Sequence, residues 1–88
     1  MPNFVIEREI PGISQISEDE VRDIAQRSLG AIQELGIQWL HSYVTDGKVY
    51  CIYWAPNAEV IREHASRMNI PANRIAAVKR LMEPATAD

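Results

Sequence analysis

Residues 37–54, IQWLHSYVTDGKVYCIYW, decide how this chain folds. The segments 37–45 and 48–54 are rich in β-branched and aromatic residues, which favour strands. Asp46-Gly47 lies between them and is a dipeptide preferred in two-residue type I′ turns. The sequence therefore predicts a β-hairpin with a type I′ turn at its tip.

Such a turn also predicts the register of the hairpin, with Tyr43 opposite Tyr50 and His41 opposite Ile52. Because side chains alternate along a strand, each strand then has two distinct faces. One predicted face carries Trp39, His41, Tyr43, Tyr50, Ile52 and Trp54, and the other carries Leu40, Ser42, Val44, Val49, Cys51 and Tyr53. A longer loop would shift the register and exchange the faces of one strand.

Two amphipathic helices flank the hairpin. The first is predicted over Glu18 to Leu35, because Ser17 and Glu20 have the spacing of a capping box and Gly36 suits a left-handed helix end. Its apolar stripe, which we expect to pack, consists of Val21, Ile24, Ala25, Ser28, Ile32 and Leu35. The second helix follows the cap residue Asn57 and ends near Asn69. Its stripe contains Val60, Ile61, His64, Ala65 and Met68, with His64 at the centre.

The two ends of the chain supply the remaining strands. Residues 3–10 are predicted as a strand that places Phe4 and Ile6 on one face and Glu7 and Glu9 on the other. Residues 74–82 are predicted as the last strand, although their alanine content also suits a helix, and residues 84–88 as a frayed tail. The order is that of a ferredoxin-like βαββαβ fold of the α+β class, a four-stranded antiparallel sheet with two helices on one face. We expect residues 1–88 to form a single domain.

Composition narrows the classes of partner. With 88 residues, 47% hydrophobic and 24% charged, the chain is typical of one soluble globular domain. Nine basic residues are dispersed among twelve acidic ones, for a net charge of −3, which argues against nucleic acid and against anionic membrane as partners. Cys51 is the single cysteine, so no intrachain disulfide can form, and we expect a cytoplasmic protein.

Aromatic residues gather in the hairpin. Five of the six lie there, and four of those five fall on the face predicted to point away from the helices. An exposed aromatic patch on a small domain marks an interface or a ligand cleft, so we expect a homodimer built partly on this face. The alternative is that aromatic residues simply favour strands.

The few soft or borderline metal donors form two sets. His41 and Tyr43 share the aromatic face, with Glu7 and Glu9 able to point the same way from the first strand. The second set is Cys51, Tyr53 and His64, in which Cys51 and Tyr53 lie on the opposite face of the hairpin and His64 faces them from the second helix. Imidazole, thiolate and oxygen donors suit divalent transition metals. The alternative for each set is structural, since a core histidine is often only hydrogen-bonded and a free cysteine behaves as a small hydrophobe.

The chain also resembles a known family from Phe4 to about Pro84. The pieces that carry the likeness are His41-Ser42-Tyr43, Cys51-Ile52-Tyr53 with Ala55-Pro56, and Arg62-Glu63-His64-Ala65. They are similar to a small bacterial ferredoxin-like family of nickel-binding proteins, mostly catalogued as a domain of unknown function. The resemblance implies a dimer that binds nickel or a similar divalent ion and has no established reaction. Its implied site residues are His41, Tyr43, Cys51, Tyr53 and His64, with Glu7 as a weaker candidate.

Three functions stay open at this point. The first is metal handling or sensing, with nickel or another divalent transition metal as the ion, because zinc and copper can occupy most nickel sites. The second is a dimeric α+β barrel enzyme acting on a small aromatic substrate between sheet and helices, with His64 or His41 as the proton carrier. The third is a plain dimerisation or regulatory module. No catalytic motif favours the enzyme, and we expect no reaction of the protein's own.

Overall fold

The structure, a computed structural model, describes residues 1–88 and has the predicted order of elements. These are β1 (Asn3–Glu9), a 3-10 turn (Ile13–Gln15), α1 (Glu18–Leu35), β2 (Gln38–Val44), β3 (Lys48–Trp54), α2 (Ala58–Met68), β4 (Arg74–Ala77) and a second 3-10 turn (Pro84–Ala87). The four strands form one antiparallel sheet in the order β2-β3-β1-β4. This is the ferredoxin-like α+β fold, as predicted.

The helix boundaries follow from the capping residues. The Ser17 side chain accepts a hydrogen bond from the Glu20 amide, and the Glu20 carboxylate accepts one from the Ser17 amide, which completes the capping box at the start of α1. Gly36 ends α1 in the left-handed conformation, and Asn69 ends α2 in the same way. Asn57 caps α2 by accepting from the Val60 amide. Both predicted helices are confirmed.

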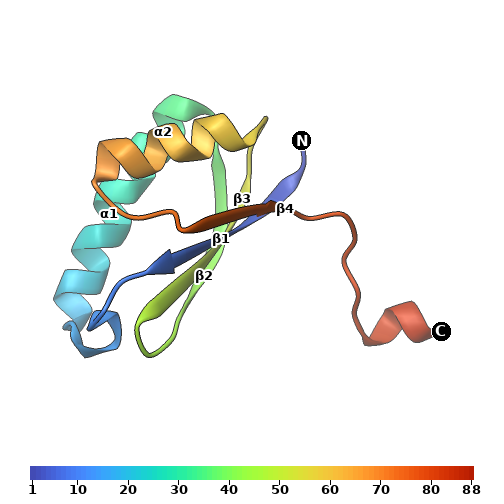
Figure 1. The fold of residues 1–88 in the computed structure, drawn as a ribbon, viewed down its shortest axis with the longest axis horizontal. Coiled ribbons are helices and arrows are strands. Elements are labelled where there is room, and N and C mark those ends of the chain that lie inside the picture. Colours follow the sequence, from blue (N-terminus) through green and yellow to red (C-terminus); the bar gives the residue numbers. More distant parts are fainter.

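The core lies on one face of the sheet. Phe4 and Ile6 of β1 and Cys51 of β3 are buried in the same cluster as Ile32 of α1 and Ile61 of α2. Both helices therefore cover the same side of the sheet, and Figure 1 shows them as a single layer. We call this side the inner face, and the side without helices the open face.

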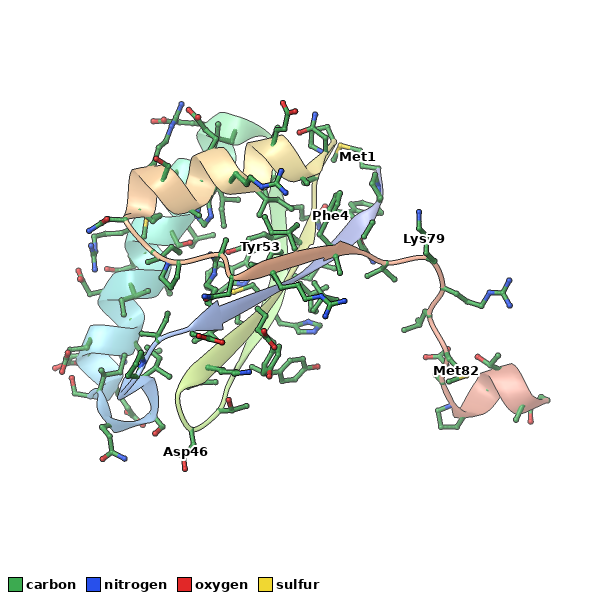
Figure 2. The ribbon with its side chains drawn as sticks, in the orientation of Figure 1. Met1, Phe4, Asp46, Tyr53, Lys79 and Met82 are labelled. Atoms are coloured by element: carbon green, nitrogen blue, oxygen red, sulfur yellow. The ribbon has the colours of Figure 1, made fainter.

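The hairpin has the predicted register but a different turn. Tyr43 pairs with Tyr50 and His41 with Ile52. Gly47 has a φ of 114°, whereas Asp46 keeps a negative φ, so the turn is not the predicted type I′, which needs positive φ at both residues. Figure 2 shows Asp46 at the tip of the hairpin. The segment after β1 contacts this tip, because the Ile10 amide donates to the Gly47 carbonyl at 2.9 Å and the Ser14 hydroxyl donates to the Asp46 carboxylate at 2.9 Å. Tertiary contact therefore set the turn conformation.

A β-bulge corrects the predicted face of Trp39. Trp39 pairs with Tyr53 and His41 with Ile52, so Leu40 is an extra residue on β2. The bulge moves Trp39 to the inner face, where it packs against the core and its Nε1–H donates to the Ser42 hydroxyl at 3.0 Å. Leu40, predicted to face the helices, is exposed instead.

The last strand is shorter than predicted. β4 ends at Ala77, opposite Phe4, and the Val78 amide donates to the Asn3 carbonyl at 2.8 Å. Residues 79–82 form no strand because β1 begins at Asn3 and offers no further partner. The chain then leaves the body of the protein (Figure 1) and closes with a 3-10 turn where a frayed tail was predicted.

Candidate functional site

The five predicted donor residues fall in two separate places, on opposite faces of the sheet. Cys51, Tyr53 and His64 are buried between the sheet and the helices, and Figure 2 shows Tyr53 in that layer. His41 and Tyr43 are exposed on the open face. Within the chain, no three or more His, Cys, Asp or Glu side chains are grouped closely enough to hold a metal ion. One chain therefore does not bring the five residues into one site.

His64 is the most enclosed of these side chains, with none of its surface exposed. Its Nε2 lies 3.1 Å from the Ser28 hydroxyl of α1, within hydrogen-bond distance. The Tyr53 ring stands edge-on to the imidazole, with ring centroids 5.6 Å apart. Nδ1 of His64 is buried and has no hydrogen-bond partner. The histidine is thus held from three elements, α1, α2 and β3.

Burial keeps the His64 imidazole and the Tyr53 phenol uncharged. Desolvation, followed by the nearby Arg8 charge, lowers the pKa of His64 from 6.5 to about 4. Desolvation also raises the pKa of Tyr53 from 10.0 to about 12, with the Cys51 charge as the next largest cause. At neutral pH the imidazole and the phenol are therefore both neutral.

Arg8 is the residue of this layer that we did not predict as part of a site. Its side chain points to the inner face and the residue is only 2% exposed. Its Nη1 donates to the Pro71 carbonyl at 2.7 Å and its Nη2 to the Tyr53 hydroxyl at 3.2 Å, while its Nε has no partner. Strand alternation from Phe4 through Ile6 places Arg8 on the inner face, so the signal was present in the sequence.

A cavity of about 490 Å³ opens between α1 and the inner face of the sheet. Arg8, Ser28, Cys51 and Tyr53 line it, and 13 of its 18 lining residues are hydrophobic. The cavity exists because only the C-terminal half of the α1 stripe packs against the core. Val21, in the N-terminal half, lines the cavity and stays 47% exposed. The prediction that the whole stripe packs is therefore only partly right.

The open face has a different character. Tyr43 is 59% exposed, and its ring is in an edge-on, T-shaped contact with that of His41, with ring centroids 5.0 Å apart. No hydrogen bond within the chain engages the His41 ring nitrogens. Trp54 on β3 is 42% exposed on the same face. Glu7 of β1 pairs with Tyr50, which pairs with Tyr43, so a carboxylate lies in the same cross-strand row.

Comparison with known proteins gives this geometry a context. Residues 4–78 match the family model described as nickel responsive protein, SCO4226-like. The chain belongs to this family. The crystal structure of SCO4226 from Streptomyces coelicolor A3(2) is similar in fold, with a TM-score of 0.78 at 19% sequence identity. The match covers 91% of this chain and 99% of that one. The search of curated proteins found no match.

The SCO4226-like chain offers two very different settings for a cation. In the buried set, Cys51 and His64 are the usual soft or borderline donors, but the Arg8 guanidinium already binds the Tyr53 hydroxyl beside them. A fixed, permanently positive group in a low-dielectric layer opposes the entry of a second cation. On the open face His41 is exposed, and the positive group beside Glu7 is the partly exposed Lys48 ammonium, 3.5 Å from its carboxylate, where solvent screens the charge. The donor chemistry therefore fits a metal ion better on the open face.

Neither α-helix combines the length and the apolar character that crossing a bilayer requires.

Proposed function

We propose that this protein is a small cytoplasmic homodimer that binds nickel, or a similar divalent ion, and acts in metal handling or sensing. Its membership of a nickel-responsive family supports a metal-linked role. The observation that carries the proposal is the solvent-exposed imidazole of His41 beside Tyr43 on the open face. Imidazole and oxygen donors together suit borderline divalent ions.

The proposed site uses the open face and narrows the five predicted ligands to His41 and Tyr43. Glu7 is the acidic candidate on this face, and its Oε1 lies 3.5 Å from the Lys48 Nζ. The pair is partly exposed to solvent, and ion pairs near the surface are weak, so a divalent ion can displace the lysine at little cost. Cys51, Tyr53 and His64 are then structural residues of the buried layer.

Dimerisation supplies the donors that one chain lacks. The open face exposes Tyr43 and Trp54, and an exposed aromatic patch favours association. A two-fold interface presents the same patch from each subunit. A dimer built on this face therefore adds a second His41 and a second Tyr43 to the site. Metal binding and dimerisation are thus expected to reinforce each other.

When bound, the metal ion would link the two subunits through these side chains. His41 has to be neutral to donate a lone pair to the ion. The carboxylate of Glu7 would offset part of the charge of the ion. In this role the ion would promote dimerisation and would not act on a substrate. Such a role suits a sensing or handling function.

Titration calorimetry of tag-free protein with nickel tests the proposal. We expect wild type to bind nickel. The His41→Ala variant should lose at least about tenfold in affinity, which corresponds to about 1.4 kcal/mol of binding free energy. His64→Ala and Cys51→Ser serve as matched controls from the buried set. Both should keep wild-type affinity if they remain folded. Zinc and copper titrations run alongside to rank the metals.

Two results would contradict the proposal in different ways. No heat for nickel, zinc or copper with wild type ends the metal hypothesis itself. Loss of binding in Cys51→Ser or in folded His64→Ala, with His41→Ala unchanged, would instead put the metal in the buried layer. Unchanged affinity in all three variants would leave a metal protein with other ligands.

A further inference from the structure

Arg8 carries a buried positive charge without an anionic partner. The five ion pairs of the structure involve other residues, and the two hydrogen-bond acceptors of Arg8, the Pro71 carbonyl and the Tyr53 hydroxyl, are neutral. An arginine side chain does not lose its proton in proteins, so this charge remains. Buried charges in proteins are normally paired because an isolated one is costly. The inner layer is therefore one negative charge short.

The cavity next to Arg8 is suited to a small organic molecule. Its volume of about 490 Å³ falls within the range of about 300 to 1,000 Å³ usual for small-molecule sites. Its walls are mostly apolar, and the polar groups among them, such as Ser28 and Tyr53, are few. An apolar enclosure with a few convergent polar groups is the usual composition of a ligand site.

We propose that this cavity binds a small organic carboxylate, with its apolar body between α1 and the sheet and its carboxylate paired with Arg8. The guanidinium has five N–H donors, of which two are used, and Nε is unpartnered although fully enclosed. Guanidinium and carboxylate match in geometry and form charge-assisted hydrogen bonds. The ligand would thus provide the missing counter-charge.

A carboxylate fits better than a phosphate because the site supplies only one free positive charge. Arg27 also lines the cavity, but it is exposed and its Nε lies 3.1 Å from the Asp23 carboxylate. Neutral His64 adds no charge at pH 7. The first turn of α1 adds negative charge, since Glu18, Asp19 and Glu20 occupy it. A monoanion balances Arg8, whereas a dianion would leave one charge unpaired.

This site is independent of the proposed metal function. It lies on the inner face of the sheet, whereas the proposed metal ligands lie on the open face. Either proposal can therefore fail without the other.

The experiment compares octanoate with octan-1-ol as probes for tag-free, full-length protein. Calorimetry gives the two affinities, and amide chemical shifts in two-dimensional NMR locate the site. We expect octanoate to bind at least about tenfold more tightly than octanol, as a single charge-assisted hydrogen bond would give. The shifts should concentrate on the inner-face residues of β1 and β3 and on the N-terminal half of α1.

Three variants sharpen the comparison. Arg8→Met removes the charge and keeps an apolar side chain of similar length, so the preference for octanoate over octanol should vanish. Ala25→Trp places a large side chain in the cavity from α1 and leaves Arg8 in the sequence, so both probes should lose binding. Arg74→Met removes an exposed arginine on the open face of the same sheet and should bind both probes as wild type does.

The outcomes decide the proposal in each case. Absence of octanoate binding by wild type overturns it, and so does equal affinity for the two probes or an unchanged preference in Arg8→Met. Shifts confined to the open face would also overturn it. Should Arg8→Met fail to fold, Ala25→Trp decides alone: retained octanoate binding rejects the cavity, and lost binding in a folded protein supports it.

Discussion

Ser28 Oγ of α1 and His64 Nε2 of α2 lie 3.1 Å apart, and this buried hydrogen bond joins the two helices above the sheet. A second link between the helices, from Arg67 Nη1 to Glu34 Oε2 at 2.9 Å, lies at the surface. The two links have similar lengths but very different surroundings. Because a buried polar group cannot turn to water when its partner is lost, the buried link should contribute far more to stability.

Replacing Ser28 by alanine tests that difference. Ser28→Ala leaves both His64 ring nitrogens without a partner in a dry layer, so we expect a loss of about 1 to 3 kcal/mol in the free energy of unfolding. Glu34→Ala, the matched control, should cost less than about 1 kcal/mol because the ion pair is exposed. Urea unfolding measures both. Equal losses would mean that the buried hydrogen bond has no special weight.

The stability of the protein should depend on pH through His64. Its pKa is about 4 in the folded protein and 6.5 in the unfolded chain, so between these values only the unfolded chain binds the proton. Stability is therefore complete above pH 6.5 and falls as the pH drops toward 4. The shift corresponds to a loss of roughly 3 kcal/mol, to be measured as urea unfolding at a series of pH values.

Two histidine variants separate this effect from other titrations. His64→Gln should flatten the fall in stability between pH 6.5 and pH 4 while keeping a polar side chain beside Ser28. His41→Gln, at an exposed position, should leave it as in wild type. The same pH profile in wild type and His64→Gln would show that other groups cause the acid destabilisation.

The aromatic open face gives a prediction about association. Trp54→Glu places a charge in the exposed patch, so we expect it to shift a dimer toward monomer at micromolar concentration. Leu29→Glu is the control, because Leu29 is a similarly exposed apolar residue on α1. Light scattering gives the mass of each. A wild-type monomer, or a dimer that Trp54→Glu leaves intact, speaks against the proposed interface.

The segment after β4 should be dispensable for the stability of a single subunit. No hydrogen bond joins residues 79–88 to the rest of the chain, and Leu81 and Met82 are exposed. Deleting residues 79–88 should therefore change the unfolding free energy by no more than about 0.5 kcal/mol. Deleting residues 73–88, which also removes β4, should prevent folding or cause a large loss. Circular dichroism during urea unfolding distinguishes these outcomes.

Features that depend on neighbouring residues along the chain could be predicted from the sequence. The start of α1 at Ser17, its end at Gly36 and the pairing of Tyr43 with Tyr50 all rest on contacts within a few residues or across one turn. The separation of His41 from Cys51 by sheet face follows from strand alternation, which is equally local. For the same reason the sequence could predict that His41 and Tyr43 share one face of the sheet.

Other features were decided only when distant segments met. The amide of Ile10 bonds to the hairpin tip and fixes its turn, and the bulge at Leu40 turns Trp39 into the core. The length of β4 depends on where the distant strand β1 begins, because Ala77 at the end of β4 pairs with Phe4 near the start of β1. The cavity arises because half of the α1 stripe has no partner. Periodicity shows which face of an element is apolar, but how closely two apolar faces approach depends on side-chain packing across the whole core.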